Sequence, residues 1–250
     1  MFRFTMRYSN YKNELNEQGY VLIPYLYSDE EITQISACLE NAEINGDGLV
    51  STKDLFAIRQ LINNIPELTS LLFNKNLIYL LNELFESDYF LTKAIYFDKP
   101  NHSNWFVAYH QDLSISVDKK AEINGYSNWT YKKGQYGVQP PIEILEDTVT
   151  MRIHLDNTDK NNGALKVIPK SHLKGIIRSD SRDWNIENDV VCKVERGGVM
   201  LMKPLTLHAS SRTSNGKRRR VIHLEFNRHL LSEPLQWLEF YRVERKSTII

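Results

Sequence analysis

The pattern of apolar residues changes near Tyr89, and this change constrains the fold more than any other feature of the chain. Beyond it, short runs rich in Val, Ile, Tyr and Phe alternate with Asn, Asp, Gly and Pro, which is typical of short antiparallel strands. These runs are, in order, YFLTKAIYF, WFVAYH, DTVTMRIHL, ALKVIP, DVVCKV, GVMLMKP and RRVIHLEF. The sequence therefore predicts a mainly β protein built as a double-sheet jelly roll or barrel.

Residues 1–88 show a different pattern, in which apolar residues recur at helical spacing. Ser28 opens the segment SDEEITQISACLENA, and Glu31 stands three residues later, which is the arrangement of a capping box. Three further segments place Leu, Ile and Phe three and four residues apart: DLFAIRQLI, PELTSLLF and NLIYLLNELF. We expect short helices here that buttress one face of the β-core.

The stretch 118–146 is polar and has no clear period. Connections of this length in a compact domain are usually lids or binding loops, so we expect a lid-like insertion. Its aromatic residues are candidates for excluding water and contacting a substrate, with ordinary loop packing as the alternative: Tyr126, Trp129, Tyr131 and Tyr136. We expect one domain, with a mostly helical part (1–88), a β-core (89–228) that carries the insertion, and a C-terminal tail (229–250).

Composition limits the classes of partner. Lys plus Arg and Asp plus Glu both count 31, so no net field attracts the chain to nucleic acid or membrane. The first residues lack the apolar run of a signal peptide, and no run approaches the roughly 18 apolar residues of a spanning helix. Cys38 and Cys192 lie far apart without CxxC spacing, which argues against a disulfide framework or a thiolate metal site. We expect a soluble, cytoplasmic protein.

A candidate metal site begins at His110 and Asp112, at the end of the apolar run WFVAY. Residues two apart in a strand project to the same face, so both side chains can meet one ion. His208, at the end of GGVMLMKPLTLH, is the candidate third ligand. Two imidazoles and one carboxylate leave coordination positions open, which suits iron(II) that binds an organic acid and dioxygen. The HxD motif alone is a weak signal, and a strand-end histidine is its alternative.

Two arginine-bearing segments are candidates for binding an anion. A basic cluster, Lys217 to Arg220, enters the last strand-like run, and a guanidinium fork matches the geometry of a carboxylate. Strand alternation allows only one of its two faces to point inward. A solvated turn or a nucleic-acid patch is the alternative for this cluster. In DTVTMRIHLD, Arg152 would bind an anionic substrate group if its face looks into the barrel, and would otherwise face solvent.

A separate segment, residues 43–54, imitates a calcium-binding EF-hand loop with Gly48 at its sixth position. The match is imperfect, because Glu43 replaces the usual first aspartate and Asp54 the bidentate glutamate. A polar turn that joins two helices is the favoured interpretation.

Taken together and in order, three segments resemble the phytanoyl-CoA dioxygenase family of iron(II) and 2-oxoglutarate oxygenases. They are FDKPNHSNWFVAYHQDLSISV, then YKKGQYGVQPPIEILEDTVTMRIHLDNTDKNNGALKVIPKSHLKG, and then GGVMLMKPLTLHASSRTSNGKRRRVIHLEF. The likeness spans most of the chain and is strongest from Phe97 to Phe226. It implies a double-stranded β-helix, the cupin-like jelly roll, buttressed by helices. Lys170 stands in IPKSH where glycine is common in the family, which puts the local turn geometry in doubt.

The resemblance assigns roles to particular residues. The family's metal ligands fall on His110, Asp112 and His208. Its 2-oxoglutarate arginine falls on Arg219, with Arg220 as the fallback. By this resemblance Ser210, two positions after the distal histidine, is a further co-substrate contact. Lys93, on the strand before the HxD strand, is another candidate, with a surface lysine as the equal alternative. The strand and loop patterns described above, and not the resemblance, give the candidate substrate contacts Arg152, Trp129 and Tyr131.

The function implied by the resemblance is an iron(II)- and 2-oxoglutarate-dependent dioxygenase that consumes O2 and releases succinate and CO2. Asp112 keeps the carboxylate that related halogenases lack, so hydroxylation of an aliphatic C–H bond in a small polar or amphiphilic metabolite is expected. We expect no nucleic-acid or membrane partner, and the sequence does not indicate an oligomeric state. The alternative is a non-oxidative cupin-like metal protein or a zinc hydrolase with the same three ligands, since zinc needs no co-substrate arginine.

Overall fold

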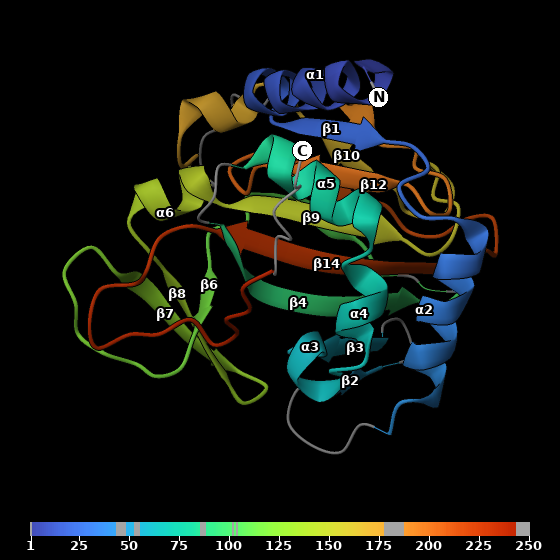
Figure 1. The fold of residues 1–250 in the computed structure, drawn as a ribbon. Coiled ribbons are helices and arrows are strands. Elements are labelled where there is room, and N and C mark those ends of the chain that lie inside the picture. The colour runs from blue at the N-terminus through green and yellow to red at the C-terminus, as the bar shows by residue number, and fades with distance from the viewer. Residues whose placement is uncertain are drawn as a thin grey trace.

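The computed structural model describes residues 2–43, 49–52, 56–85, 89–101, 103, 105–177 and 188–243. Its centre is a seven-stranded antiparallel sheet, the major sheet, in the order β1-β12-β9-β14-β4-β3-β2 (Figure 1). Its strands are β1 Tyr20–Ile23, β2 Leu49–Ser51, β3 Phe56–Arg59, β4 Phe90–Lys99, β9 Val149–His154, β12 Val199–Met202 and β14 Arg219–Asn227. The first strand of the chain thus pairs with β12, late in the chain, with Tyr20 opposite Met202.

Two smaller antiparallel sheets complete the β-structure. The minor sheet has the order β11-β10-β13-β5, formed by β5 Val107–His110, β10 Leu165–Val167, β11 Val190–Val191 and β13 His208–Ser210. The third sheet has the order β6-β8-β7, formed by β6 Ile115–Val117, β7 Ser127–Lys132 and β8 Gln135–Gln139. The third sheet extends to one side of the major sheet (Figure 1).

Helices from the first third of the chain pack on the outer face of the major sheet (Figure 1). They are α1 Phe2–Gln18, α2 Asp29–Asn41, α3 Leu61–Asn64, α4 Leu68–Leu72 and α5 Lys75–Leu84; α6 Ile142–Asp147 and the 3-10 turn Ser171–Lys174 come later. The capping box is confirmed, because Ser28 Oγ accepts from the Glu31 N–H and Glu31 accepts from the Ser28 N–H. No helix within the described ranges is long and apolar enough to cross a membrane.

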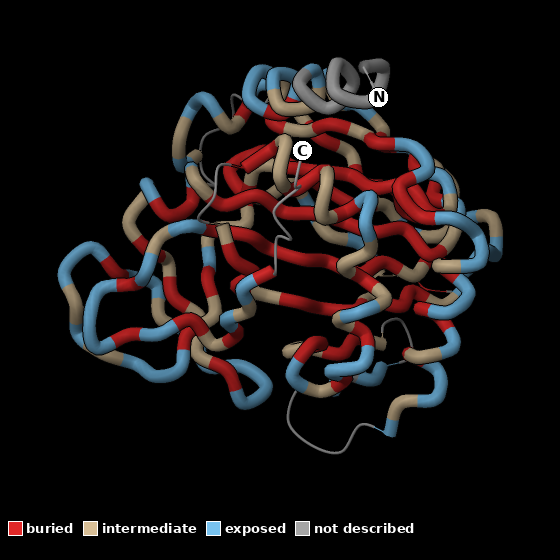
Figure 2. Tube along the Cα trace, in the orientation of Figure 1, coloured by how far each residue is buried: buried red, intermediate tan, exposed pale blue. Residues whose placement is uncertain are grey.

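The major sheet is buried on both faces, as Figure 2 shows for its central strands. All six residues of β9 are buried. Val149, Met151 and Ile153 belong to the hydrophobic core under the helices, whereas Arg152 on the opposite face lines a cavity. One face of the sheet thus supplies hydrophobic stability, and the other is free to carry polar chemistry.

One predicted helix is wrong. Within DLFAIRQLI, Phe56–Arg59 forms β3, which pairs along the edge of β4 with Arg59 opposite Ile95. Only the following Leu61–Asn64 is helical. The apolar spacing of this short segment fits either structure, and the open edge of the long strand β4 decides in favour of the strand.

The predicted insertion at 118–146 is more regular than expected. It contains the hairpin β7–β8 and the helix α6. Lys133 and Gly134 both have positive φ at its two-residue turn, as the right-handed twist of a hairpin requires. Most of β7 is exposed, so no hydrophobic alternation marked it in the sequence.

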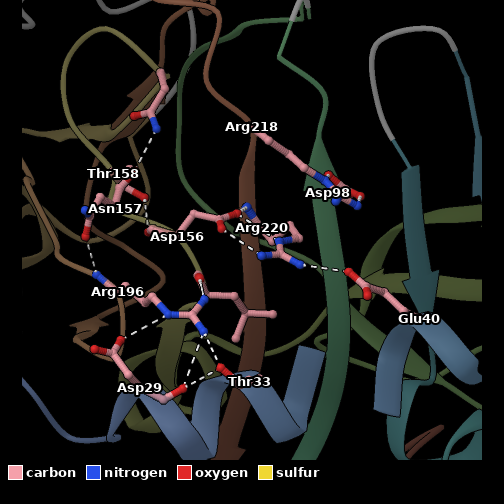
Figure 3. A network of polar contacts seen from close by, with 12 residues as sticks. Asp29, Thr33, Glu40, Asp98, Asp156, Asn157, Thr158, Arg196, Arg218 and Arg220 are labelled. Atoms are coloured by element: carbon pink, nitrogen blue, oxygen red, sulfur yellow. Dashed lines mark hydrogen bonds and ion pairs between the residues drawn. The ribbon is translucent and has the colours of Figure 1, made fainter. Parts of the chain in front are cut away.

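Two residues of the basic cluster, Arg218 and Arg220, form ion pairs (Figure 3). Arg220 contacts Asp156 Oδ1 at 2.8 Å and Glu40 Oε1 of α2 at 3.2 Å, and Arg218 makes two contacts with Asp98. These carboxylates compensate the charges that a nucleic-acid patch would need. Of the EF-hand-like segment, residues 44–48 and 53–55 lie outside the described residues.

Candidate metal centre

The minor sheet brings the predicted metal ligands together. His110 is the last residue of β5, and His208 is the first residue of β13, directly opposite it in the antiparallel register. The run GGVMLMKPLTLH is not one strand as expected, because β12 ends at Met202 in the major sheet and β13 begins at His208 in the minor sheet. The crossing between the two sheets carries the distal histidine to the site.

The three side chains converge on one point. The Nε2 atoms of His110 and His208 each lie 3.5 Å from an oxygen of Asp112. One potential ligand atom from each residue lies within 4.8 Å of the other two. Both histidines place Nδ1 at a backbone carbonyl, Ala108 O at 2.8 Å and Thr206 O at 2.9 Å. Since Nδ1 donates its hydrogen there, each Nε2 lone pair is left for a metal ion.

The electrostatics favour the metal-binding form of two ligands, Asp112 and His208. Burial acts to raise the pKa of Asp112, but the charges of His208 and His110 outweigh it and hold that pKa well below its usual range. Burial lowers the pKa of His208. A carboxylate with a neutral imidazole is the donor set that iron(II) accepts, and three ligands on one side leave positions free. The residues present therefore fit a mononuclear iron centre.

Gln111 stands between the two HxD ligands and was not among the predicted site residues, yet it anchors the site. Its Nε2 donates to Gly175 O at 2.8 Å and Leu205 O at 2.6 Å, and its Oε1 accepts from Ile177 N at 2.8 Å. The side chain is buried against these backbone groups, in the loop that follows β5. This position between two inward ligands was the signal available in the sequence.

Gln111→Leu is expected to lower the free energy of unfolding by about 3 kcal/mol, because buried carbonyls and an N–H lose their partners. Urea denaturation of the metal-free protein measures this change. Gln236→Leu is the control, since Gln236 is exposed and should tolerate the change. Equal stability of the Gln111 variant and the control would contradict an anchoring role.

A small cavity of about 250 Å³ opens beside the three ligands. It is lined by Phe97, Trp105, Val107, His110, Asp112, Arg152, Leu165, His208, Ser210, Arg219 and His223. The predicted co-substrate residues Arg219 and Ser210 thus share one space with the candidate metal ligands. We call this space the metal cavity.

Arg219, the first residue of β14, is buried without a countercharge. Its Nη1 donates to Gly163 O, while its Nε has no partner. It forms no ion pair with any residue that the structure describes. Burial, with a smaller contribution from nearby Arg152, lowers the pKa of Arg219 to about 9. A buried guanidinium of this kind is costly unless an anion accompanies it.

The two other candidate arginines, Arg220 and Arg152, lie on different faces of the major sheet. The fallback, Arg220, points to the opposite face of β14 and is held by Asp156 and Glu40, so it does not reach the metal cavity. Arg152 is buried rather than solvent-facing, and its Nη1 lies 3.2 Å from His223 Nδ1. Its Nε has no partner. The metal cavity therefore contains two guanidiniums.

A second cavity of about 480 Å³ adjoins the first, sharing Phe97, Asp112 and His223 with it. We call it the outer cavity. Lys93 lines the outer cavity and not the metal cavity, so it does not lie where a co-substrate contact was expected. Its Nζ contacts Glu225 Oε2 at 2.8 Å and Ser114 O at 3.2 Å, so its charge is compensated.

Two expected substrate contacts lie outside both cavities. On β7 the residues that line the outer cavity are Asn128, Thr130 and Lys132. Trp129 packs on a separate hydrophobic cluster instead, and Tyr131 is 64% exposed. Strand alternation explains this result, because a hairpin can present only every second residue to the cavity. The strand itself was not recognised in the sequence, so its register was not available.

The comparisons with known proteins agree with this geometry. The family model described as "Phytanoyl-CoA dioxygenase (PhyH)" matches residues 15–221. The comparison with curated protein sequences gave no match.

Three solved structures illustrate the likeness in fold. The non-heme alpha ketoglutarate dependent epimerase SnoN from nogalamycin biosynthesis has a TM-score of 0.68 and 14% identity, covering 96% of this chain and 95% of its own. HygX from Streptomyces hygroscopicus, with nickel and 2-oxoglutarate bound, has a TM-score of 0.65 and 14% identity, and the match covers 90% of this chain and 88% of HygX. The non-heme alpha ketoglutarate dependent carbocyclase SnoK from nogalamycin biosynthesis has a TM-score of 0.63 and 19% identity, and the match covers 87% of this chain and 83% of SnoK. The predicted jelly roll with a helical N-terminal part is confirmed.

Proposed function

The chain belongs to the phytanoyl-CoA dioxygenase family, and from this premise we propose that it hydroxylates an aliphatic C–H bond of a small molecule. This membership confirms the family predicted from the sequence and, with it, iron(II) and 2-oxoglutarate as cofactor and co-substrate. The observation that carries the proposal is the uncompensated guanidinium of Arg219 in the same small cavity as His110, Asp112 and His208.

His110, Asp112 and His208 would hold the metal, because their donor atoms converge and both imidazoles are oriented by backbone carbonyls. When bound, iron(II) supplies the activation of dioxygen, coupled to decarboxylation of 2-oxoglutarate to succinate and CO2. Arg219 binds the distal carboxylate of the co-substrate through its planar fork. Ser210 lines the same cavity and offers a hydroxyl to that carboxylate.

The apolar residues of the metal cavity have a separate role. Phe97, Val107 and Leu165 line it together with the ring of Trp105. Once the co-substrate fills the cavity, these side chains exclude water and strengthen the charge interaction at Arg219.

Hydroxylation is the outcome that Asp112 favours, because its carboxylate occupies the position that a halide would need. A small-molecule substrate is supported by the outer cavity, which reaches Asp112 from the side of β7 and β8. Solved relatives in fold were crystallised with such molecules: HygX with hygromycin B, and SnoN with nogalamycin RO.

The proposal extends to organisation and location. A single domain is supported by the pairing of β1 with β12, which joins the helical first part to the β-core. A cytoplasmic location is supported by two free cysteines, Cys38 and Cys192.

A zinc hydrolase with the same ligands explains the metal cluster but leaves Arg219 without a role.

The test of the proposed function is succinate release from 2-oxoglutarate by protein loaded anaerobically with iron(II). Small metabolites are then screened for those that stimulate this release and gain one oxygen atom by mass spectrometry. We expect iron-dependent succinate formation and such a product. Hydrolysis by the zinc-loaded protein, with no succinate from the iron-loaded protein, would overturn the proposal.

A further inference from the structure

A row of four paired residues crosses the major sheet beneath both cavities. Arg59 on β3 lies opposite Ile95 on β4, Ile95 opposite His223 on β14, and His223 opposite Arg152 on β9. Paired residues project to the same face, and all four line a cavity. Since strands lie roughly 4.8 Å apart, the backbone of Arg59 is about 14 Å from that of Arg152. The row runs from the metal cavity to the far end of the outer cavity.

Arg59 is a half-buried cation without a countercharge. Its guanidinium has no hydrogen bond or ion pair within the described part of the chain. Burial lowers the pKa of Arg59 from its ordinary value. The neighbouring cation Lys93 is compensated by Glu225 at 2.8 Å. Arg59 is therefore a strong candidate for pairing with an anion that enters the outer cavity.

Gln135 on β8 is a second unsatisfied group on the same cavity. It is only 7% exposed, and its Nε2 has no hydrogen-bond partner. Because a buried amide donor without a partner is costly, it calls for an acceptor from a bound molecule. It lines the outer cavity on the hairpin side, across from the sheet that carries Arg59.

The remaining lining is rich in hydroxyl and amide groups. These residues are Ser114, Ser116, Asn128, Thr130 and Gln139. Some of these groups already bond within the protein, as Asn128 Nδ2 does to Gln139 Oε1 at 2.8 Å. A hydrocarbon chain would remove their remaining donors and acceptors from water without replacing those hydrogen bonds. A hydroxyl-rich molecule would replace those bonds, while Phe97 and Tyr136 offer ring faces to its carbon skeleton.

We propose that the outer cavity binds a hydroxyl-rich substrate with one carboxylate or phosphate group, which pairs with Arg59 while an oxygen accepts from Gln135 Nε2. The reacting carbon then lies at the Asp112 end of the cavity, and the anionic group marks the other end. This assignment rests on the proposed function, because it concerns the substrate of the same reaction.

The test uses matched compounds: gluconate and glucose 6-phosphate as anionic polyols, glucose and sorbitol as uncharged ones, and dodecanoate as an apolar acid. Thermal shift of the iron-free protein measures binding, and succinate release by the iron-loaded protein measures turnover. We expect an anionic polyol to bind at least about tenfold more tightly than its uncharged counterpart. Comparing gluconate with glucose 6-phosphate shows whether the site prefers a carboxylate or a phosphate.

Three variants make the test specific. Arg59→Gln should lose the preference for the anionic polyols, and Arg59→Lys should retain part of it. Gln135→Ala should weaken binding without lowering the melting temperature of the free protein, since its Nε2 bonds nothing there. Lys120→Gln, at an exposed position, is the control. Equal binding of charged and uncharged polyols, tighter binding of dodecanoate, or an unaltered Arg59→Gln protein would overturn the assignment. Basal succinate release tests the proposed function separately.

Discussion

His208→Ala is expected to abolish iron-dependent succinate release and to weaken iron binding by more than about a hundredfold. Loss of a residue that merely orients a ligand costs roughly 10- to 100-fold, and loss of one of three ligands should cost more. His208 is the buried member of the cluster, with its Nδ1 hydrogen-bonded to Thr206 O and its Nε2 facing Asp112. Metal analysis after anaerobic loading and an assay of succinate formation measure both effects.

The control for this variant is His229→Ala. His229 lies outside the two cavities, where its Nε2 contacts Asp147. Its removal should leave iron content and turnover unchanged. Both variants should remain folded, because losing one hydrogen bond costs about 1 kcal/mol. A His208→Ala protein that still binds stoichiometric iron and turns over would exclude His208 as a ligand.

The metal ligands could be predicted because the HxD motif is short and because three family-like segments follow one another in order. His110 and Asp112 stand two apart, and the alternation expected of a strand predicted that they share a face. In the structure β5 ends at His110, and Asp112 follows it in a loop where its N–H donates to Pro204 O. The crossing that brings His208 opposite His110 was not visible, because the run before it is mostly apolar and is interrupted only briefly, by Lys203 and Pro204, between the two strands. His208 was a candidate from its place at the end of a strand-like run, and the family resemblance then assigned it as the third ligand.

The cavity walls could be predicted less well, for a physical reason. The hairpin β7–β8 is mostly exposed and polar, so it lacks the hydrophobic alternation from which a strand is recognised. Its contribution to the outer cavity, including Gln135, became apparent only from its register with β6. Likewise, β3 is defined by the edge of β4, a partner distant in sequence, so Arg59 was placed in a helix.

The choice between Arg219 and Arg220 needed both the strand pattern in the sequence and the side-chain packing in the structure. Alternation predicted that only one of them points inward, without saying which. In the structure, Ile222, Leu224 and Phe226 belong to the core under the helices. Arg220 shares their outward direction, and Arg219 lines the metal cavity. The pairing of Arg220 with Asp156 and Glu40 completes the distinction.

Arg219→Leu and Arg220→Leu should therefore have opposite effects. Arg219→Leu is expected to raise the KM for 2-oxoglutarate by at least about thirtyfold, because truncating one partner of a buried charge pair costs about 2 to 5 kcal/mol. The free energy of unfolding of the free protein should change by less than about 1 kcal/mol, since the variant also removes an uncompensated buried charge. Steady-state succinate assays and urea denaturation measure the two quantities.

Arg220→Leu should leave the KM for 2-oxoglutarate unchanged and lower the free energy of unfolding by about 2 kcal/mol, because Asp156 loses its partner in a partly buried pair. Arg219→Lys should recover part of the affinity, since a lysine keeps the charge but not the planar fork. If the KM rose in the Arg220 variant instead, the co-substrate would have to bind on the outer face of β14. That face is occupied by core side chains and by α2, so this outcome would refute the site as a whole and not a single residue.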